Sequence, residues 1–139
     1  MELVEKTQTD GKKCRSCGEV KSLSEYHKGS YSDGLDNRCK SCKIELNRNT
    51  RYIKTYGITI DDYNKIFKEQ EGNCGICNKH QVEFKKRFAV DHDHDTGEVR
   101  GLLCFDCNIG IGKLGDNIEG LEQALRYLNG DTRRNSDRR

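Results

Sequence analysis

The sequence contains no tryptophan, one methionine and only four histidines among its 139 residues. Hydrophobic residues make up 32% of the chain and charged residues 35%, which excludes a large hydrophobic core. A domain of this length buries only about two-thirds of the surface of its unfolded chain. We therefore expect one domain, or at most two very small ones, stabilised by something beyond hydrophobic burial.

Long apolar segments are also missing. No uncharged apolar run approaches the roughly eighteen residues of a membrane span. The first residues, MELVEKTQTDGKK, lack the apolar stretch that a secretory signal requires. We expect a soluble, intracellular protein with no membrane partner.

Cysteine is the residue that the chain has in excess. Its eight cysteines form four Cys-x-x-Cys pairs, Cys14/Cys17, Cys39/Cys42, Cys74/Cys77 and Cys104/Cys107. In a reducing compartment such pairs predict zinc ligands. The alternatives are disulfides of a small secreted protein and a redox pair, but the signal peptide and the βαβ context that these require are absent. The spacing predicts two local sites, each holding one structural Zn²⁺ with four thiolates.

The organisation follows the cysteines and the charge. Residues 1–55 hold 12 Lys/Arg against 8 Asp/Glu, and residues 56–130 hold 9 against 13. We predict an N-terminal four-cysteine zinc module with a basic linker helix over 1–55, a second zinc-containing domain over 56–130, and a basic disordered tail over 131–139. The basic side chains of the linker helix are Lys43, Arg48, Arg51 and Lys54. They could bind a phosphate backbone, or they could form the solvated surface of a linker.

The second half predicts a small α+β arrangement. Thr59 and Asp62 are spaced as an N-cap, and Gly72-Asn73 would end that helix. Short apolar runs over 88–90 and 99–103 predict a two-stranded ribbon, and a short helix interrupted by glycines would start at Cys104. A last helix over 117–129 has one apolar face, formed by Ile118, Leu121, Leu125 and Leu128. We expect this face to pack on its own domain; the alternative is an interface in a homodimer.

The segment between the two predicted strands carries a concentration of ionisable groups. It reads VDHDH over residues 90–94, and Asn108 directly follows Cys107. Hydrolysis of a phosphodiester needs a base for the attacking water and a cation for the phosphoryl oxygens. Histidine is a natural base near neutral pH, and carboxylate and amide oxygens suit Mg²⁺. Asp91, His92 and Asn108 supply this set. Asp93 and Asp95 are interpreted as acids of the loop.

These motifs resemble a known family. The segments YGIT, CGIC, VDHDH and VRGLLCFDCN, in this order between Tyr56 and Asp116, resemble the phage recombination endonuclease VII family of HNH (ββα-metal, His-Me finger) endonucleases. The four-cysteine module of residues 14–42 resembles one appended to phage members. The expected fold is an HNH nuclease core with an N-terminal zinc module and flanking helices. If a phage encodes the chain, we expect it in the cytoplasm of a bacterial host.

The resemblance also implies roles for individual residues. Asp91 and Asn108 would bind one catalytic divalent cation, Mg²⁺ or Mn²⁺, and His92 would be the general base. His94 matches a second family histidine that would contact the phosphate or assist the leaving group. The expected activity is that of a DNA endonuclease, a phosphodiester hydrolase of EC class 3.1, leaving 5′-phosphate and 3′-hydroxyl ends.

The substrate and the alternatives stay open at this point. Branched DNA and a sequence-selected duplex are both candidate substrates, and cleavage of branched DNA would require a homodimer. Further candidate DNA contacts are Lys85, Lys86, Arg87 and Arg100. The main alternative function is a non-catalytic double zinc-binding module for nucleic acid or protein. A zinc-dependent hydrolase of small molecules is disfavoured, since closed four-thiolate sites leave no open metal position.

Overall fold

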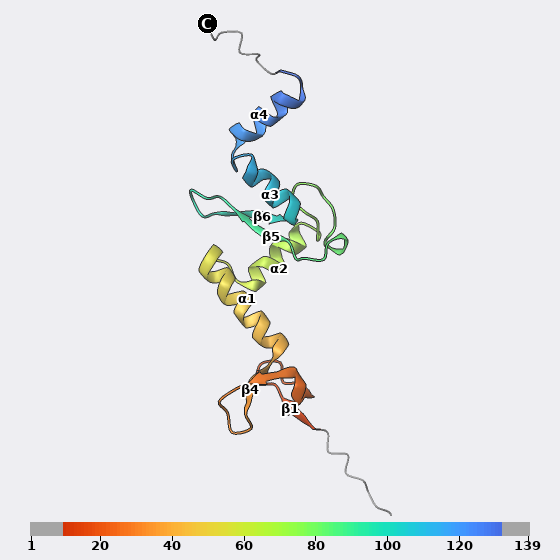
Figure 1. Ribbon diagram of the computed structural model, residues 1–139, viewed down its shortest axis with the longest axis vertical. Coiled ribbons are helices and arrows are strands. Elements are labelled where there is room, and N and C mark those ends of the chain that lie inside the picture. The colour runs from red at the N-terminus through yellow and green to blue at the C-terminus, as the bar shows by residue number, and fades with distance from the viewer. Residues whose placement is uncertain (1–9, 132–139) are drawn as a thin grey trace, which may run out of the picture. The chain divides into compact units, whose positions relative to one another are not determined.

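The computed structural model describes residues 10–131 (Figure 1). The chain divides into two compact units, Met1–Thr55 and Tyr56–Arg139. Within the described range, no helix is both long and apolar enough to cross a membrane. All but the first residue of the expected basic tail lies outside the described residues.

Unit 1 is built from two small hairpins followed by a helix. Its elements are β1 (Gly11–Lys13), β2 (Val20–Ser22), the 3-10 helix η1 (Leu23–Glu25), β3 (Tyr26–Lys28), β4 (Leu35–Cys39) and α1 (Lys40–Tyr56). Strands β1 and β2 pair antiparallel, as do β3 and β4. The buried core consists of Cys14, Tyr26 and Cys39, with Leu35 and Cys42 packed against it. Sulfur atoms therefore take the place of much of the aliphatic core.

Unit 2 contains the predicted two-stranded ribbon between helices. Its elements are α2 (Ile60–Glu69), the 3-10 helix η2 (Gln81–Glu83), β5 (Ala89–His92), β6 (Val99–Leu103), α3 (Phe105–Lys113) and α4 (Ile118–Leu128). The last residue of α1, Tyr56, also belongs to this unit. The order strand, strand, helix over β5, β6 and α3 is the expected ββα arrangement, so the small α+β prediction is confirmed (Figure 1).

The predicted N-cap of α2 at Thr59 is confirmed, whereas the predicted end at Gly72-Asn73 is not. Thr59 and Asp62 form a capping box in which each side chain accepts a hydrogen bond from the other residue's backbone N–H. Buried Tyr63 donates its hydroxyl hydrogen bond to the carbonyl of Phe88 at 3.0 Å. The helix ends at Glu69, three residues before Gly72, because the chain turns at Glu71 with a positive φ of 52°.

Gln70, the residue after the helix, connects the end of α2 to β6. Its side-chain amide accepts from the Leu102 N–H (2.8 Å) and donates to the carbonyls of Leu102 (2.9 Å) and Asn73 (2.8 Å). The amide thus pairs with the backbone of β6 as a neighbouring strand would. A Cβ on Gly101 would lie 2.9 Å from Gln70 Oε1, so any larger residue there would displace this amide from its contacts with β6.

We expect Gln70→Leu to lower the free energy of unfolding of unit 2 by about 2 kcal/mol. The replacement leaves the backbone N–H of Leu102 without its partner, and Leu102 is fully buried. Urea unfolding monitored by circular dichroism measures the change. Gln123→Leu on exposed α4 is the matched control and should change the stability little; equal effects of both substitutions would contradict this role of Gln70.

The ribbon and the helix after it differ in detail from the predicted pattern. Strand β5 continues through His92, two residues beyond the apolar run, and its pairing with β6 shifts register between Asp91 and His92. Such a bulge re-aims side chains at the end of a strand. Helix α3 is continuous over Gly110 and Gly112, so the predicted interruption is wrong there. The first glycine to break it is Gly115, at φ 93°.

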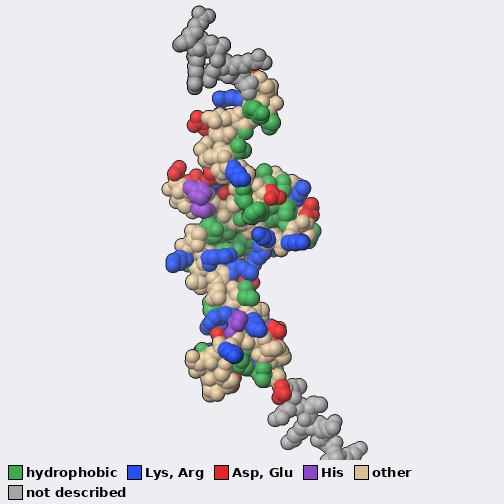
Figure 2. All heavy atoms as spheres, in the orientation of Figure 1, with side chains coloured by type: hydrophobic (Ala, Val, Ile, Leu, Met, Phe, Trp, Pro, Cys, Tyr) green, Lys and Arg blue, Asp and Glu red, His purple; other side chains and the backbone are tan. Residues whose placement is uncertain are grey.

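The expected packing of α4 on its own domain is wrong. Asn117 caps the helix by accepting from the Gly120 N–H at 2.8 Å. Its apolar residues are nevertheless exposed, at 76% for Ile118, 43% for Leu121, 58% for Leu125 and 79% for Leu128. Figure 2 shows hydrophobic side chains on the surface of α4. The helix is anchored at its N-terminus, and its apolar face is left open to solvent.

Candidate active site

The four Cys-x-x-Cys pairs come together as two clusters, one in each unit. In each cluster the four sulfur atoms all lie within 4.8 Å of one another. Four thiolates around Zn²⁺ at about 2.3 Å would be separated by about 3.8 Å, and Cys77 Sγ lies 3.9 Å from Cys104 Sγ. Both clusters therefore fit a tetrahedral metal ion. In residues 10–131, they are the two groups of His, Cys, Asp or Glu side chains close enough to hold one.

The two clusters share the same local geometry although the units do not share a sequence repeat. In each, the backbone N–H of the third cysteine donates to the first sulfur at 3.3 Å, from Cys39 to Cys14 and from Cys104 to Cys74. The residue after the second cysteine has a positive φ, 73° at Gly18 and 58° at Asn78. Both turns thus point backbone donors at sulfur, which favours the thiolate form.

The ionisation of the thiols follows from this geometry. Hydrogen bonds from the backbone of Cys17 and Cys39 lower the pKa of Cys14 to about 6. Burial raises the pKa of Cys74, but backbone hydrogen bonds led by Cys104 outweigh it and lower the pKa to about 6. A hydrogen bond with Cys39, followed by burial, raises the pKa of Cys42 to about 12. Thiols whose pKa is raised in this way favour ionisation when a cation binds among them.

The second cluster positions the start of α3. Cys104 is its N-cap residue, and its sulfur accepts from the Cys107 N–H at 3.5 Å. The Asn108 N–H donates to the Cys104 carbonyl at 3.0 Å, which places Asn108 in the first turn. Helix α3 contacts β5, the strand that carries Asp91 and His92. The cluster therefore fixes the element that carries Asn108 against the strand that carries the other two residues.

Asp91 is the one buried charged residue among those the structure describes, with 9% of its surface exposed. Its carboxylate accepts two hydrogen bonds from Arg100, from Nε at 2.8 Å and from Nη2 at 3.1 Å. Arg100 Nη2 also donates to Asp116 Oδ1. These two carboxylates raise the pKa of Arg100 further above its usual value. A buried carboxylate that already binds a cationic group is a chemically suitable ligand for a hard divalent cation.

The His92 ring lies between two other rings. Its centroid is 5.2 Å from that of Tyr56, in an edge-on arrangement, and 4.6 Å from that of His94. His94 Nε2 is in turn 3.5 Å from Asp116 Oδ2. Figure 2 shows histidine side chains beside acidic ones at this part of unit 2. The predicted base thus has a fixed ring orientation, and the second histidine joins it to an acid from the α3–α4 connection.

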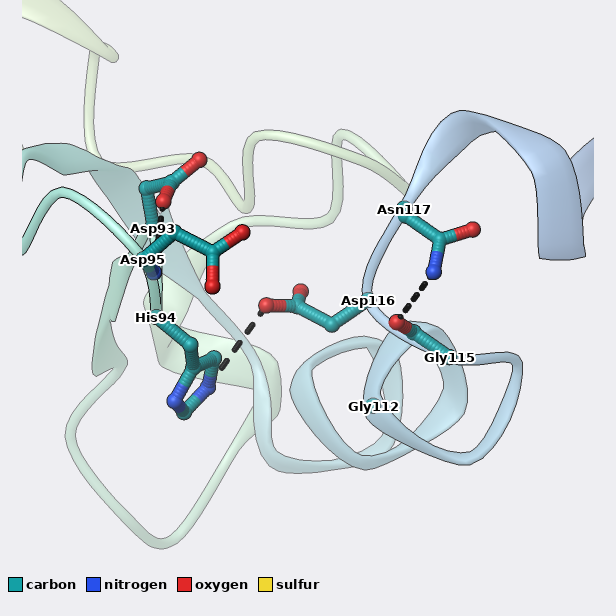
Figure 3. A pocket seen from close by; sticks show the side chains of 7 residues that line it. All are labelled: Asp93, His94, Asp95, Gly112, Gly115, Asp116 and Asn117. Carbon is teal, nitrogen blue, oxygen red and sulfur yellow. Dashed lines mark hydrogen bonds and ion pairs between the residues drawn. The ribbon is translucent and has the colours of Figure 1, made fainter.

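A pocket of about 490 Å³ opens beside these groups. It is lined by Asp93, His94, Asp95, Gly112, Gly115, Asp116 and Asn117. Figure 3 shows the His94 ring directed at Asp116 across this pocket. Asp93 Oδ1 accepts from the backbone N–H of Asp95 (2.8 Å) and of Thr96 (2.9 Å), so it organises the loop as expected. These bonds, with Thr96 first, lower the pKa of the Asp93 carboxyl.

Two residues of this site were not selected from the sequence. Asp116 pairs with both Arg100 and His94, and Tyr56 contacts His92. Neither position carries a sequence signal for this role, since Asp116 follows a glycine-rich helix end and Tyr56 ends a basic helix. Only the folded chain brings them to the ribbon.

Most of the basic side chains predicted to contact DNA already contact another group of the protein. Lys43 pairs with Asp36 at 3.1 Å, and Arg48 pairs with Glu45. Four further basic side chains have partners within the protein: Arg51 lies over the Tyr52 ring, Lys86 over the Phe105 ring and Arg87 over the Tyr63 ring, and Arg100 binds Asp91 and Asp116. Lys54 and Lys85 are exposed. Much of the positive charge thus has an intramolecular partner in the absence of DNA.

Comparison with known proteins gives a consistent assignment. Residues 48–130 match the family model of recombination endonuclease VII. The chain is 50% identical over 80 residues to the Gene 59 protein of Mycobacterium phage L5, covering 57% of this chain and 48% of that protein. It is 46% identical over 90 residues to the Gene 59 protein of Mycobacterium phage D29, covering 64% and 54% respectively. The chain thus spans about half the length of these relatives.

Among solved structures, the ββα-Me type II restriction endonuclease Hpy99I is similar to this chain. The two are 25% identical, with a TM-score of 0.39, over 88% of this chain and 67% of that one. The family model covers well over half of the chain and includes the ββα arrangement, the second cysteine cluster and the Asp91-His92 pair. The chain therefore belongs to the recombination endonuclease VII family.

Proposed function

We propose that this protein is a metal-dependent endonuclease that hydrolyses phosphodiester bonds of DNA. The observation that carries the proposal is the buried Asp91 carboxylate beside His92 at the bulge of β5, on a strand that contacts the helix bearing Asn108. Family membership supports the same activity. The cysteine clusters bind structural Zn²⁺ in this proposal, and they have no open position for substrate.

Each residue has a defined role in the proposed reaction. Asp91 and Asn108 hold a divalent cation, Mg²⁺ or Mn²⁺, which offsets negative charge on the phosphate when bound. A ring nitrogen of His92 takes the proton from the attacking water. The water oxygen bonds to phosphorus and the bond from phosphorus to the 3′-oxygen breaks. The leaving oxygen takes a proton from solvent or from His94, so that a 5′-phosphate and a 3′-hydroxyl result. His94 contacts the phosphate or assists the leaving oxygen.

A cleavage assay on three substrates tests this function. Zinc-loaded protein is incubated with a four-way junction, a sequence-diverse linear duplex and single-stranded DNA, each with Mg²⁺ or Mn²⁺, and the cut positions are mapped. We propose branched DNA or a selected duplex as the substrate, so the junction or a defined duplex sequence should be cut preferentially. Equal cutting of all three would indicate a nonspecific nuclease.

The second candidate function is a non-catalytic double zinc-binding module for nucleic acid. The two clusters and the exposed Lys54 and Lys85 agree with it equally well. It gives no role to Asp91, His92 and Asn108. Absence of nicking of supercoiled plasmid with every divalent metal, by protein that carries both zinc ions and binds DNA, would favour this module.

We also propose a homodimer in which the exposed apolar face of α4 is buried. Wild-type protein should sediment with twice the mass of one chain at micromolar concentration, and Leu125→Glu should sediment as a single chain. Leu125 is 58% exposed, so the new charge would be tolerated in the monomer and costly in an interface. Gln123→Glu adds the same charge away from this face and should remain dimeric. A monomeric wild type would contradict the dimer without affecting the catalytic assignment.

A further inference from the structure

Arg100 connects acids from two different parts of unit 2. Both oxygens of Asp91, on β5, accept from its guanidinium, at 2.8 and 3.1 Å. Its Nη2 also donates to Asp116, between α3 and α4. The side chain of Asp91 is 12% exposed, that of Asp116 is 18% exposed and that of Arg100 is 37% exposed. One guanidinium thus pairs with two acids that are mostly buried.

We propose that Arg100 is an internal counter-ion that competes with the divalent cation for Asp91, and that Asp116 retains the guanidinium when Asp91 binds that cation. This inference rests on the proposed function, because it assumes that Asp91 is a ligand of the cation. Arg100 is a positioning residue here, and Asp116 acts through it.

Competition follows from the charges and the donor geometry. A guanidinium that binds both carboxylate oxygens occupies much of their capacity to accept, and it carries the same sign of charge as the incoming metal ion. Two cations on one buried carboxylate repel each other strongly in a partly buried site. Release of Arg100 from Asp91 is therefore favourable when a divalent cation binds.

Asp116 makes this release possible without exposing an unpaired charge. Nη2 already donates to Asp116, so the guanidinium can turn away from Asp91 while it keeps that bond. Asp116 also lines the pocket of about 490 Å³ and lies 3.5 Å from His94 Nε2. Arg100 and Asp116 both line a second pocket, of about 240 Å³, which gives the guanidinium space to move into. Figure 3 shows the other side of Asp116, where it pairs with His94.

The test is a titration of DNA-free protein with Mn²⁺, by calorimetry, with both zinc ions in place. We expect Arg100→Gln to lower the Kd for Mn²⁺ by about tenfold, since it removes the competing charge. Arg100→Lys, which keeps the charge but not the two-pronged contact, should lie between this variant and the wild type. Asp116→Asn should raise the Kd, because Arg100 is then held by Asp91 alone.

The double variant Arg100→Gln/Asp116→Asn gives the sharpest result. If Asp116 acts through Arg100, the double variant should bind Mn²⁺ as Arg100→Gln does. Arg126→Gln is the control, since Arg126 pairs with Glu122 on exposed α4 and should leave the Kd unchanged. Zinc content and melting temperature, measured for every variant, show that unit 2 remains folded.

Other outcomes would overturn the inference. An Arg100→Gln variant that is folded and binds Mn²⁺ no more tightly than the wild type would refute competition. An equal effect of Asp116→Asn with and without Arg100 would show that Asp116 acts by its own charge. Asp91→Asn separates this inference from the proposed function. If Asp91→Asn binds Mn²⁺ as the wild type does, the assigned metal site is wrong as well; if it loses binding and Arg100→Gln shows no gain, only the role of Arg100 fails.

Discussion

Replacing His92 with alanine should lower the rate of DNA cleavage on the order of 10³-fold, since a positioned general base contributes about 10² to 10⁴. The imidazole is half-buried between the rings of Tyr56 and His94, so its removal takes away the oriented base while the strand pairing of β5 stays in place. Single-turnover nicking of supercoiled plasmid measures the effect, with the divalent metal saturating.

The matched control is His27→Ala. His27 is exposed on β3 in unit 1, so its removal should leave the cleavage rate within twofold of the wild type. His92→Ala should keep both zinc ions and its affinity for DNA. A zinc-loaded His92→Ala protein that cleaves at the wild-type rate would remove His92 from the mechanism.

Replacing Cys107 with serine should unfold the ββα part of unit 2 and abolish cleavage. The cluster fixes the first turn of α3, and structural zinc contributes about 10 to 16 kcal/mol to folding in small zinc-binding peptides. Unit 2 has few other sources of stability, because its core is confined to a few side chains around β5, β6 and α2. Zinc content should fall from two ions per chain to one, and the thermal transition of unit 2 should disappear.

Cys42→Ser is the corresponding change in unit 1. Cys42 is the fourth ligand of its cluster, as Cys107 is of the other. This variant should also lose one zinc ion, but it should lose the thermal transition of unit 1 and keep that of unit 2. If Cys107→Ser retains two zinc ions and a normal transition of unit 2, the second cluster is not the structural centre that we propose.

The cysteine clusters and the ββα order were predictable because both depend on local spacing. Four Cys-x-x-Cys pairs leave few ways to group ligands, and the helix cap at Thr59 is a contact three residues apart. The ribbon followed from two short apolar runs, with an error of two residues at the end of β5. These signals survive folding because each involves consecutive segments of the chain: one helix start for the cap, two successive strands for the ribbon, and two successive Cys-x-x-Cys pairs for each cluster.

The remaining features depend on contacts between distant residues. The end of α2 is connected to β6 by Gln70, whose amide pairs with Leu102, 32 residues away. Asp116 reaches Arg100 and His94 only after α3 has folded back on β5. The apolar periodicity of α4 correctly predicted a helix, but periodicity does not state what covers the apolar face. The network around Asp91 therefore could not be read from the sequence.

The two cysteine clusters share a local geometry, but the residues that follow them differ, and this difference limits the number of active centres. The residue after the fourth cysteine is Asn108 in unit 2, but it is Lys43 in unit 1, where its ammonium group pairs with Asp36 at 3.1 Å. A lysine at that position repels a divalent cation instead of binding one. His27 on β3 also lacks the preceding acid that His92 has in Asp91. Under the proposed function, residues 10–131 thus carry a single cutting centre. This centre breaks one strand per catalytic event, so a double-strand break needs a second such centre or two successive encounters.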